Sequence, residues 1–152
     1  VSALCGTSCK GAPTTPCKHG NWQKDFMDGV SQRQLEVDFM PLHIYDIPDP
    51  EKFLTFVDDV HNCYGLPIWI TEFAKRDWSA NATKPNKYSV EEVNSFMEVV
   101  IPGLEEREFV QKYSWFDTHT NNHNYEKLRT SELIFDANES VAVPVGETYA
   151  RL

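Results

Sequence analysis

The hydrophobic residues of this chain follow two patterns that alternate along it. Three short, nearly continuous apolar runs, residues 37–45, 66–72 and 109–116, are typical of β-strands covered on both faces. Around them, four segments are predicted to be helical: 21–30, 50–64, 89–104 and 144–152. This order of helices and strands predicts an α/β fold with parallel strands, although a proline at position 41 is unusual within a strand.

Several residues mark where the predicted helices begin and end. Asp49, followed by a proline, is typical of a helix start, and Gly65 is suited to the left-handed conformation that ends it. Ser89 and Glu92 have the spacing of a capping box. Pro102 lies within the helix that follows, and we expect it to kink or split the last turns.

The segments between these elements are polar loops with features of a secreted protein. Residues 1–20 have no hydrophobic period and are predicted to be a cysteine-containing loop, and residues 73–87 form a second long loop. The four cysteines allow two disulfides in three pairings: Cys5, Cys9, Cys17 and Cys63. Asn81 and Asn138 both begin N-glycosylation patterns. We therefore expect a secreted, extracellular or cell-wall protein.

The cysteines and histidines could also form a metal site. Cys5, Cys9, Cys17 and His19 carry the ligand types that zinc prefers, but their spacing lacks the paired knuckles of common zinc modules. His119 and His123 would suit zinc only on a helix, and their surroundings are rich in asparagine. No metal is therefore predicted.

Composition limits the possible partners. A net charge of −9 disfavours binding to nucleic acid or to an anionic membrane surface. The longest apolar stretches are far shorter than the roughly 20 residues of a membrane-spanning helix, so no membrane insertion is expected. We predict one soluble domain over residues 1–152, with any secretion signal already removed.

Candidate chemistry lies at the ends of the strands, where parallel β/α arrays place their ligand sites. The side chains there are His43, Tyr45 and Asp46, then Thr71 and Glu72, and finally Trp115, Phe116 and Asp117. Glu72 directly follows five apolar or small residues, and burying its charge unpaired would cost several kcal/mol. It either serves a site or forms a salt bridge with Lys75 or Arg76.

The other candidates are suited to holding a sugar. His43 and Tyr45 could hydrogen-bond hydroxyl groups, and Trp115 could stack on a sugar ring. Trp78 in the second loop and Asp117 behind the third strand complete the predicted substrate-binding set. Each of these residues, taken singly, is more often part of a core.

The strand sequences resemble a known family. LPIWITEFA at residues 66–74 resembles the nucleophile strand of the glycosyl hydrolase catalytic core group, glycoside hydrolase family 128. VDFMPLHIY at 37–45 is similar to an earlier strand of that family, and YSWF at 113–116 to its last barrel strand. Residues 133–149, with Pro144, Gly146 and Tyr149, resemble its closing segment.

The resemblance implies a fold, an activity and a gap. Members are mostly endo-β-1,3-glucanases with a TIM-type (β/α)8 barrel, of which this chain would supply about strands 5/6 to 8. Glu72 would be the nucleophile of a retaining hydrolysis of β-glucan that needs no cofactor. The family's acid/base glutamate follows an asparagine and precedes a proline, and Asn138-Glu139 here is followed by serine, so that group would come from outside this chain.

Two expectations follow from that gap. This chain alone would be inactive, and the missing N-terminal half of the barrel would be supplied by another chain or segment, because three strands cannot close a barrel. The alternative functions are a non-catalytic glucan-binding protein and a cell-wall structural protein derived from a hydrolase.

Overall fold

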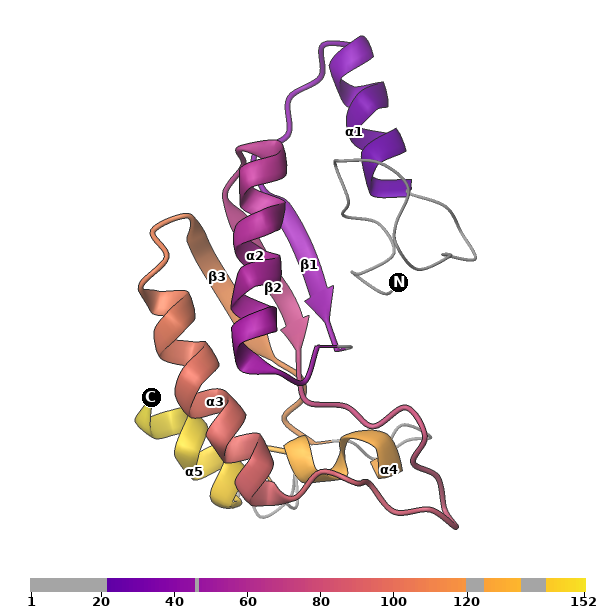
Figure 1. The fold of residues 1–152 in the computed structure, drawn as a ribbon, viewed down its shortest axis with the longest axis vertical. Coiled ribbons are helices and arrows are strands. Elements are labelled where there is room, and N and C mark those ends of the chain that lie inside the picture. The colour runs from indigo at the N-terminus through magenta and orange to yellow at the C-terminus, as the bar shows by residue number, and fades with distance from the viewer. Residues whose placement is uncertain (1–21, 46, 120–124, 135–141) are drawn as a thin grey trace.

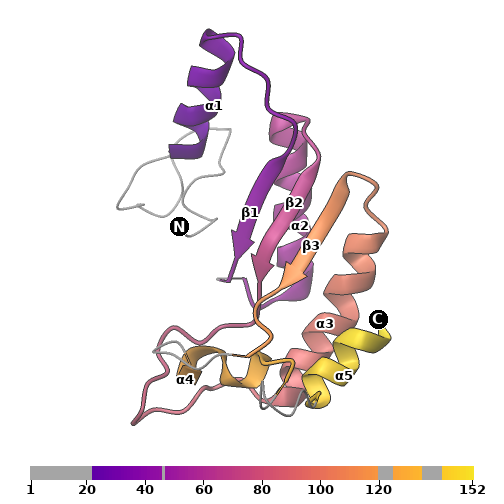
Figure 2. The same cartoon turned by 180° about the vertical axis from the view of Figure 1, so that it is seen from behind.

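The computed structural model describes residues 22–45, 47–119, 125–134 and 142–152. The elements are, in chain order, α1 (Trp22–Gln32), β1 (Met40–Ile44), α2 (Pro50–Tyr64), β2 (Ile68–Phe73), α3 (Val90–Glu105), β3 (Val110–Trp115), α4 (Tyr125–Leu128), the 3₁₀ turn η2 (Arg129–Ser131) and α5 (Pro144–Arg151). The strands form one parallel sheet in the order β1-β2-β3. Helices α2 and α3 lie over one face of this sheet, whereas Figure 2 shows no described helix crossing the other face (Figure 1, Figure 2). The predicted α/β fold with parallel strands is confirmed.

Side chains alternate between the two faces of the sheet. In β1, Leu42 and Ile44 are buried toward the helices, and His43 between them is exposed on the other face. In β2, Ile70 is likewise buried toward the helices. The register places His43 beside Glu72, so the two polar strand-end residues are neighbours.

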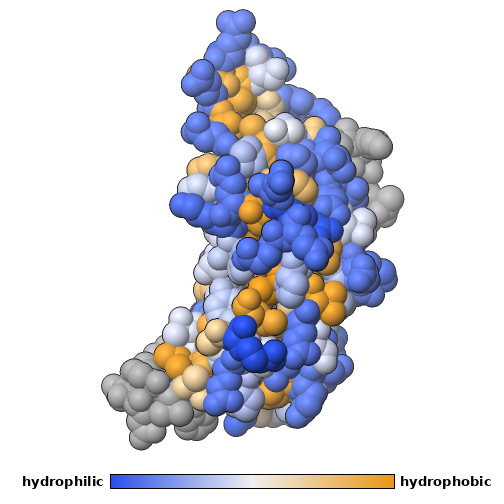
Figure 3. Space-filling model, turned by 90° about the vertical axis from the view of Figure 1, so that its left-hand side faces the viewer, coloured by the Kyte–Doolittle hydropathy of each residue, from blue (hydrophilic) through white to orange (hydrophobic). Residues whose placement is uncertain are grey.

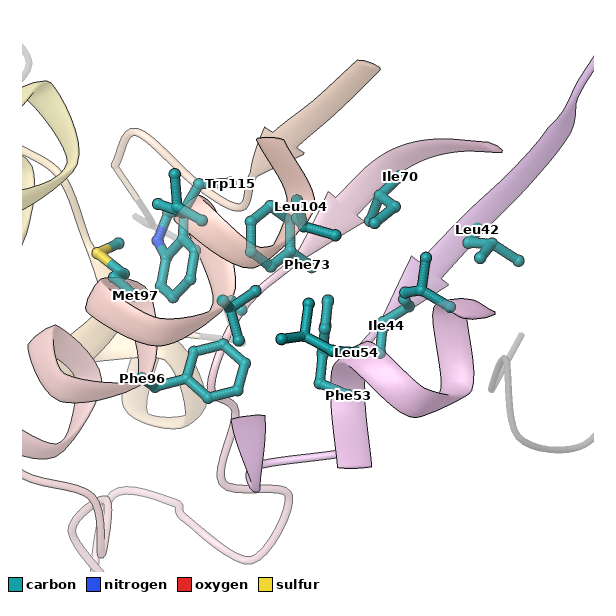
Figure 4. Close-up of a cluster of buried hydrophobic side chains, with 14 of the residues drawn as sticks. Leu42, Ile44, Phe53, Leu54, Ile70, Phe73, Phe96, Met97, Leu104 and Trp115 are labelled. Carbon is teal, nitrogen blue, oxygen red and sulfur yellow. The ribbon is translucent and has the colours of Figure 1, made fainter. Parts of the chain in front are cut away.

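The hydrophobic core lies between the sheet and helices α2 and α3 (Figure 4). Phe53 of α2 contacts Phe73 of β2 and Phe96 of α3, with ring centroids 5.5 and 5.6 Å apart. Val57 and Val60 continue the same face of α2. Since each such side chain contributes about 1.5–3 kcal/mol when buried, this layer fixes β1 and β2 against the helices.

The predicted helix signals are present in the structure. The Asp49 side chain accepts a hydrogen bond from the Lys52 amide, and Gly65 ends α2 at φ 64°. Ser89 and Glu92 form the complete capping box of α3. The strands begin and end within one to three residues of the predicted runs.

The predicted split of the third helix at Pro102 is wrong. Helix α3 runs unbroken from Val90 to Glu105. The carbonyl that loses its donor to proline belongs to Glu98, whose residue is exposed to solvent, and Val100 and Leu104 hold the helix by burial on either side. Packing therefore outweighs the local cost of the proline.

The short segment α4–η2 was not predicted, because four- and three-residue elements are too short to show a hydrophobic period. It supports the loop between β2 and α3. Asp77 is buried in that loop, and its carboxylate accepts hydrogen bonds from the Ser79 amide at 2.9 Å and the Lys87 amide at 3.1 Å. The Lys127 carbonyl of α4 accepts from the Asp77 amide and from Asn86 Nδ2, each at 3.0 Å. The loop is therefore fixed onto α4.

The described residues near the C-terminal end form a bridge and a helix. Ile134 and Ala142 form an antiparallel bridge, and α5 follows as the predicted terminal helix. Large hydrophobic side chains also reach the surface, among them Phe26 of α1 and Leu35 just after it. Figure 3 shows orange hydrophobic residues at the upper end of the molecule, where Figure 1 places α1.

Several predictions fall on residues that are not described. Cys5, Cys9, Cys17 and His19 in the loop 1–20 lie outside the described residues, and so do His123 and Asn138. Cys63 lies in α2, but its possible partners do not lie in the described part, so the pairing stays a prediction. Among the described helices, none is long and apolar enough to cross a membrane.

Candidate active site

The candidate site is built on the carboxyl ends of β1 and β2. His43 is the last but one residue of β1, Tyr45 follows that strand, and Glu72 is the last but one residue of β2. Because the strands are parallel and adjacent, their ends meet at one edge of the sheet. Three of the residues predicted from the sequence are therefore brought together.

Glu72 is held by two side chains from the neighbouring strand. The Tyr45 hydroxyl donates a hydrogen bond of 2.5 Å to Glu72 Oε2, and His43 Nδ1 lies 3.3 Å from the same oxygen. In the described part of the chain, Glu72 Oε1 has no recorded partner. The Glu72 side chain is 33% exposed, so the carboxylate is oriented through one oxygen and the side chain is partly accessible to solvent.

The Tyr45 hydroxyl is stabilised as a hydrogen-bond donor. Burial of the phenol raises its pKa well above the ordinary value of 10.0, and the hydrogen bond to Glu72 and the negative charge of Glu72 raise it further. The positive charge of Arg76 acts in the opposite direction, and Asp117 adds a smaller increase. Tyr45 therefore keeps its proton at every physiological pH and continues to donate to Glu72.

Aromatic rings surround this pair on one side. Tyr45 packs edge-on against Phe116 at 5.9 Å and against Trp78 at 6.5 Å between ring centroids. The Arg76 guanidinium lies 3.9 Å from the Trp78 centroid and 5.5 Å from that of Tyr45. Trp78 is 53% exposed, so part of its ring is accessible to solvent next to Tyr45.

The expectation that Trp115 is a stacking platform is wrong. Trp115 is 5% exposed, and its Nε1 donates a 2.7 Å hydrogen bond to the Ser131 carbonyl. Its ring packs against Phe73 and Phe96 on the helix side of the sheet (Figure 4). The next residue, Phe116, points to the site instead, which follows from the alternation of side chains along a strand.

Basic residues near Glu72 have other contacts. Among the described residues, the side-chain nitrogen recorded near the Glu72 carboxylate belongs to His43 rather than to Lys75 or Arg76. Lys75 is buried, with its Nζ 3.4 Å from the Glu92 carbonyl and 4.8 Å from the centre of the Tyr88 ring. The sequence alternative of a simple salt bridge at the rim is therefore not what the structure shows.

Phe116 and Arg76 are site residues that the sequence prediction did not select. Phe116 was placed at a strand end but was not separated from Trp115, although neighbouring residues of a strand must face opposite sides. Arg76 was considered only as a salt-bridge partner of Glu72. No sequence signal shows that it would stack on Trp78, because that contact depends on the loop conformation.

Comparison with known proteins assigns the chain to a family. The model of the glycosyl hydrolase catalytic core family matches residues 5–149. The chain belongs to this family. The resemblance of its strands to glycoside hydrolase family 128 is confirmed by solved structures of that family, which share the fold.

The proteins that this chain matches are longer than the chain itself. Alkali-sensitive linkage protein 1 of Schizosaccharomyces pombe is 33% identical over 106 residues, which are 70% of this chain and 18% of the yeast protein. A subgroup I endo-β-1,3-glucanase of family 128 from Amycolatopsis mediterranei, solved with laminaritriose, is 28% identical, with a TM-score of 0.69 over 86% of this chain and 51% of the glucanase.

A subgroup V exo-β-1,3-glucanase from Cryptococcus neoformans shares the fold, with 23% identity and a TM-score of 0.67 over 84% of this chain and 48% of that enzyme. The chain thus spans about half the length of the solved glucanases and about a fifth of the yeast protein.

Proposed function

We propose that this chain carries the nucleophile of a retaining β-1,3-glucan hydrolase and that Glu72 is that nucleophile. The observation that supports this most is the arrangement around Glu72, whose Oε2 is contacted by Tyr45 and His43, whereas Oε1 has no recorded partner among the described residues. A carboxylate fixed through one oxygen presents the other in a defined direction. This is the requirement for attack on an anomeric carbon.

The proposed reaction has two steps. Glu72 Oε1 forms a bond to the anomeric carbon while the bond from that carbon to the leaving sugar oxygen breaks, and an acid/base carboxyl gives this oxygen a proton. Water then replaces Glu72 at the same carbon, and the second carboxylate takes the proton of the water. Tyr45 keeps its hydroxyl proton throughout and stabilises Glu72 as a leaving carboxylate.

The acid/base group is proposed to come from outside this chain. In a retaining site the two carboxyl groups lie about 5–5.5 Å apart. Within the described residues, the recorded polar contacts of Glu72 are with a phenol and an imidazole. The matched region covers 51% of the solved glucanase, which leaves room for a segment that supplies the acid/base. The chain alone is then expected to bind sugar weakly and to leave it intact.

The proposed substrate is a β-1,3-glucan. Trp78 supplies an exposed aromatic surface beside Tyr45, the hydrogen-bond partner of Glu72, and the His43 side chain is 44% exposed and can also reach a hydroxyl group. Asp117 lies near enough to Tyr45 to affect its pKa and is a further substrate contact. The endo-β-1,3-glucanase at 28% identity was solved with laminaritriose, a β-1,3-linked sugar, which supports the choice of linkage. An extracellular or cell-wall location is proposed with it, because that is where such polymers occur.

Hydrolysis of laminarin by the natural full-length protein tests this function. Wild type should release reducing sugar, and Glu72→Gln should lower kcat by about a thousandfold or more, because the amide cannot form the glycosyl-enzyme. Glu105→Gln is the matched control, since Glu105 is on α3 and contacts Tyr113 rather than the site.

Other outcomes select the alternatives. A wild-type protein that binds laminarin but does not cleave it is a glucan-binding protein. One that neither binds nor cleaves it has a structural role, and the glucanase proposal fails.

A further inference from the structure

An exposed turn lies in the loop between β2 and α3. Asn81 and Lys84 form an antiparallel bridge, with Asn81 N donating to the Lys84 carbonyl at 2.9 Å and Lys84 N donating to the Asn81 carbonyl at 3.0 Å. All four residues of this turn are exposed to solvent. The turn therefore has a defined backbone conformation while its side chains remain accessible.

The side chains of this turn are arranged around an N-glycosylation sequence. Asn81-Ala82-Thr83 fits the acceptor pattern, which arises often by chance, so the local structure must be considered. Asn81 Oδ1 accepts hydrogen bonds from Thr83 N at 3.0 Å and from Thr83 Oγ1 at 2.8 Å. The asparagine amide and the threonine hydroxyl, the two groups that define the pattern, thus lie together on an exposed turn.

The amide nitrogen remains available. Asn81 Nδ2 has one recorded contact, a long hydrogen bond of 3.4 Å to the Ser79 carbonyl. The base of the turn is fixed, because Lys84 Nζ donates to Ser79 Oγ at 2.9 Å and Ser79 is bound to the buried Asp77. A sugar on Asn81 would therefore extend into solvent without disturbing the hydrogen bonds below it.

We propose that Asn81 is an N-glycosylation site. The donor would be an oligosaccharide linked to a lipid through a diphosphate. Asn81 Nδ2 forms a bond to the first sugar's anomeric carbon as the bond from that carbon to the lipid diphosphate breaks. The amide loses one proton, and the lipid diphosphate leaves with the electron pair of the broken bond. No oxidant or reductant is needed.

The position of this site has a structural consequence. Asn81 follows Trp78 by three residues in the loop that Asp77 fixes onto α4. In Figure 1 this loop extends from the end of β2 below the sheet and past α4. The glycan would stand at the rim of the aromatic surface rather than on the helices that cover the core. This inference does not depend on whether Glu72 is catalytic.

Peptide mass spectrometry of the natural full-length protein produced in yeast tests the proposal. Asn138→Gln serves as the background, and the glycan is assigned on the peptide that contains Asn81. Treatment with peptide N-glycosidase should remove a glycan and convert Asn81 to aspartate. Thr83→Ser, which keeps the pattern, should retain the glycan, and Asn81→Gln should lose it.

A further variant separates loss of the acceptor from loss of the turn. Ala82→Pro keeps both side chains but abolishes the acceptor pattern. Among the described residues, the non-glycine residue with positive φ is Gln34, so the backbone at Ala82 is not in the left-handed region. Ala82→Pro should give folded protein without the glycan. Unmodified Asn81 in the Asn138→Gln protein overturns the proposal, and so does a glycan that persists on Asn81 in Ala82→Pro.

Discussion

Tyr45 and Glu72 form a hydrogen-bonded pair in which the phenol is the donor and the carboxylate is the acceptor. The phenol is half-buried, and the loss of solvation on burial disfavours its charged form. Ionisation would also place a second negative charge beside Glu72 at a donor–acceptor distance of 2.5 Å. Both effects keep the hydroxyl protonated, so its role is to donate, and this role can be removed without removing the ring.

Tyr45→Phe removes the hydroxyl and leaves the ring contacts with Phe116 and Trp78. A hydrogen bond to a charged group contributes about 1.5–3 kcal/mol, so kcat on laminarin should fall about ten- to a hundredfold while KM changes less. Tyr113→Phe is the matched control, because Tyr113 donates to Glu105 on the exposed side of α3 and should not change kcat. An unchanged kcat in Tyr45→Phe would show that the phenol does not support Glu72.

The raised pKa of Tyr45 also predicts how stability depends on pH. A tyrosine whose folded pKa lies above its unfolded value contributes stability that is fully present below about pH 10, the unfolded value. This contribution is lost as the pH rises through the folded pKa. The difference in free energy of unfolding between wild type and Tyr45→Phe should therefore be constant from pH 6 to pH 9, measured by urea denaturation. A difference that shrinks within this range would contradict the assignment.

The buried Trp115 and the exposed Trp78 should respond differently to replacement by phenylalanine. Trp115→Phe leaves the buried Ser131 carbonyl without its donor and should lower the free energy of unfolding by about 1–3 kcal/mol. Trp78→Phe changes an exposed side chain and should alter it by less than about 0.5 kcal/mol while raising KM for laminarin. Urea denaturation and steady-state kinetics measure both. A KM effect confined to Trp115→Phe would reverse the assignment of the stacking residue.

The sequence was sufficient to bring His43, Tyr45 and Glu72 to one edge of the sheet, because strand ends and parallel order can be predicted from hydrophobic runs. It was not sufficient to orient all of the strand-end side chains. Trp115 lies two residues after Tyr113 in β3, and both rings pack against Phe73, so β3 alternates regularly there. An irregularity lies instead in β2 between Ile70 and Phe73, and it shifts the side to which Glu72 points. No hydrophobic pattern in the sequence marks where it occurs.

At the scale of elements, features set by local signals could be predicted from the sequence, and features set by packing could not. The start of α2 at Asp49 and the capping box of α3 could be predicted because capping depends on residues a few positions apart. The unbroken course of α3 past Pro102 could not, since it depends on burial against elements distant in sequence. Helix α5 also depends on such packing, because Gly146 lies against the backbone of Leu133.

Gly146→Ala should therefore destabilise the protein. A Cβ at this position would lie 2.0 Å from the Leu133 carbonyl oxygen, which also accepts a hydrogen bond from Val143 N. Backbone cannot move aside as a side chain can, so the free energy of unfolding should fall by about 1–3 kcal/mol, as measured by urea denaturation.

Gly29→Ala is the matched control for that variant. There the new Cβ meets only the flexible end of Arg33, and alanine favours a helix over glycine by up to about 1 kcal/mol. Equal destabilisation by both variants would show that the loss arises from the helix rather than from the contact with Leu133.

At the scale of the whole molecule, the sheet is covered by described helices on one face only. The other face carries Trp69, which stacks on Phe39 with ring centroids 3.8 Å apart and lies 4.1 Å below the Lys112 ammonium. Trp69 Nε1 also donates to Gln111. In a (β/α) barrel this face is the interior and is filled by side chains from all strands, so the half-buried Trp69 should gain a cover where further strands complete the barrel, as we propose.

Oxidation of tryptophan by N-bromosuccinimide, read by peptide mass spectrometry, tests this prediction on three residues at once. In the isolated 152-residue chain Trp69 and Trp78 should both react, whereas Trp115 should be protected by its burial in the core. In the natural full-length protein Trp69 should become protected, because the remaining strands would close over it, while Trp78 at the mouth of the site should still react. Trp78 therefore controls for reagent access and Trp115 for unfolding. If Trp69 reacted equally in both proteins, the uncovered face would not be a barrel interior, and the acid/base of Glu72 would have to be sought elsewhere than in strands that close this sheet.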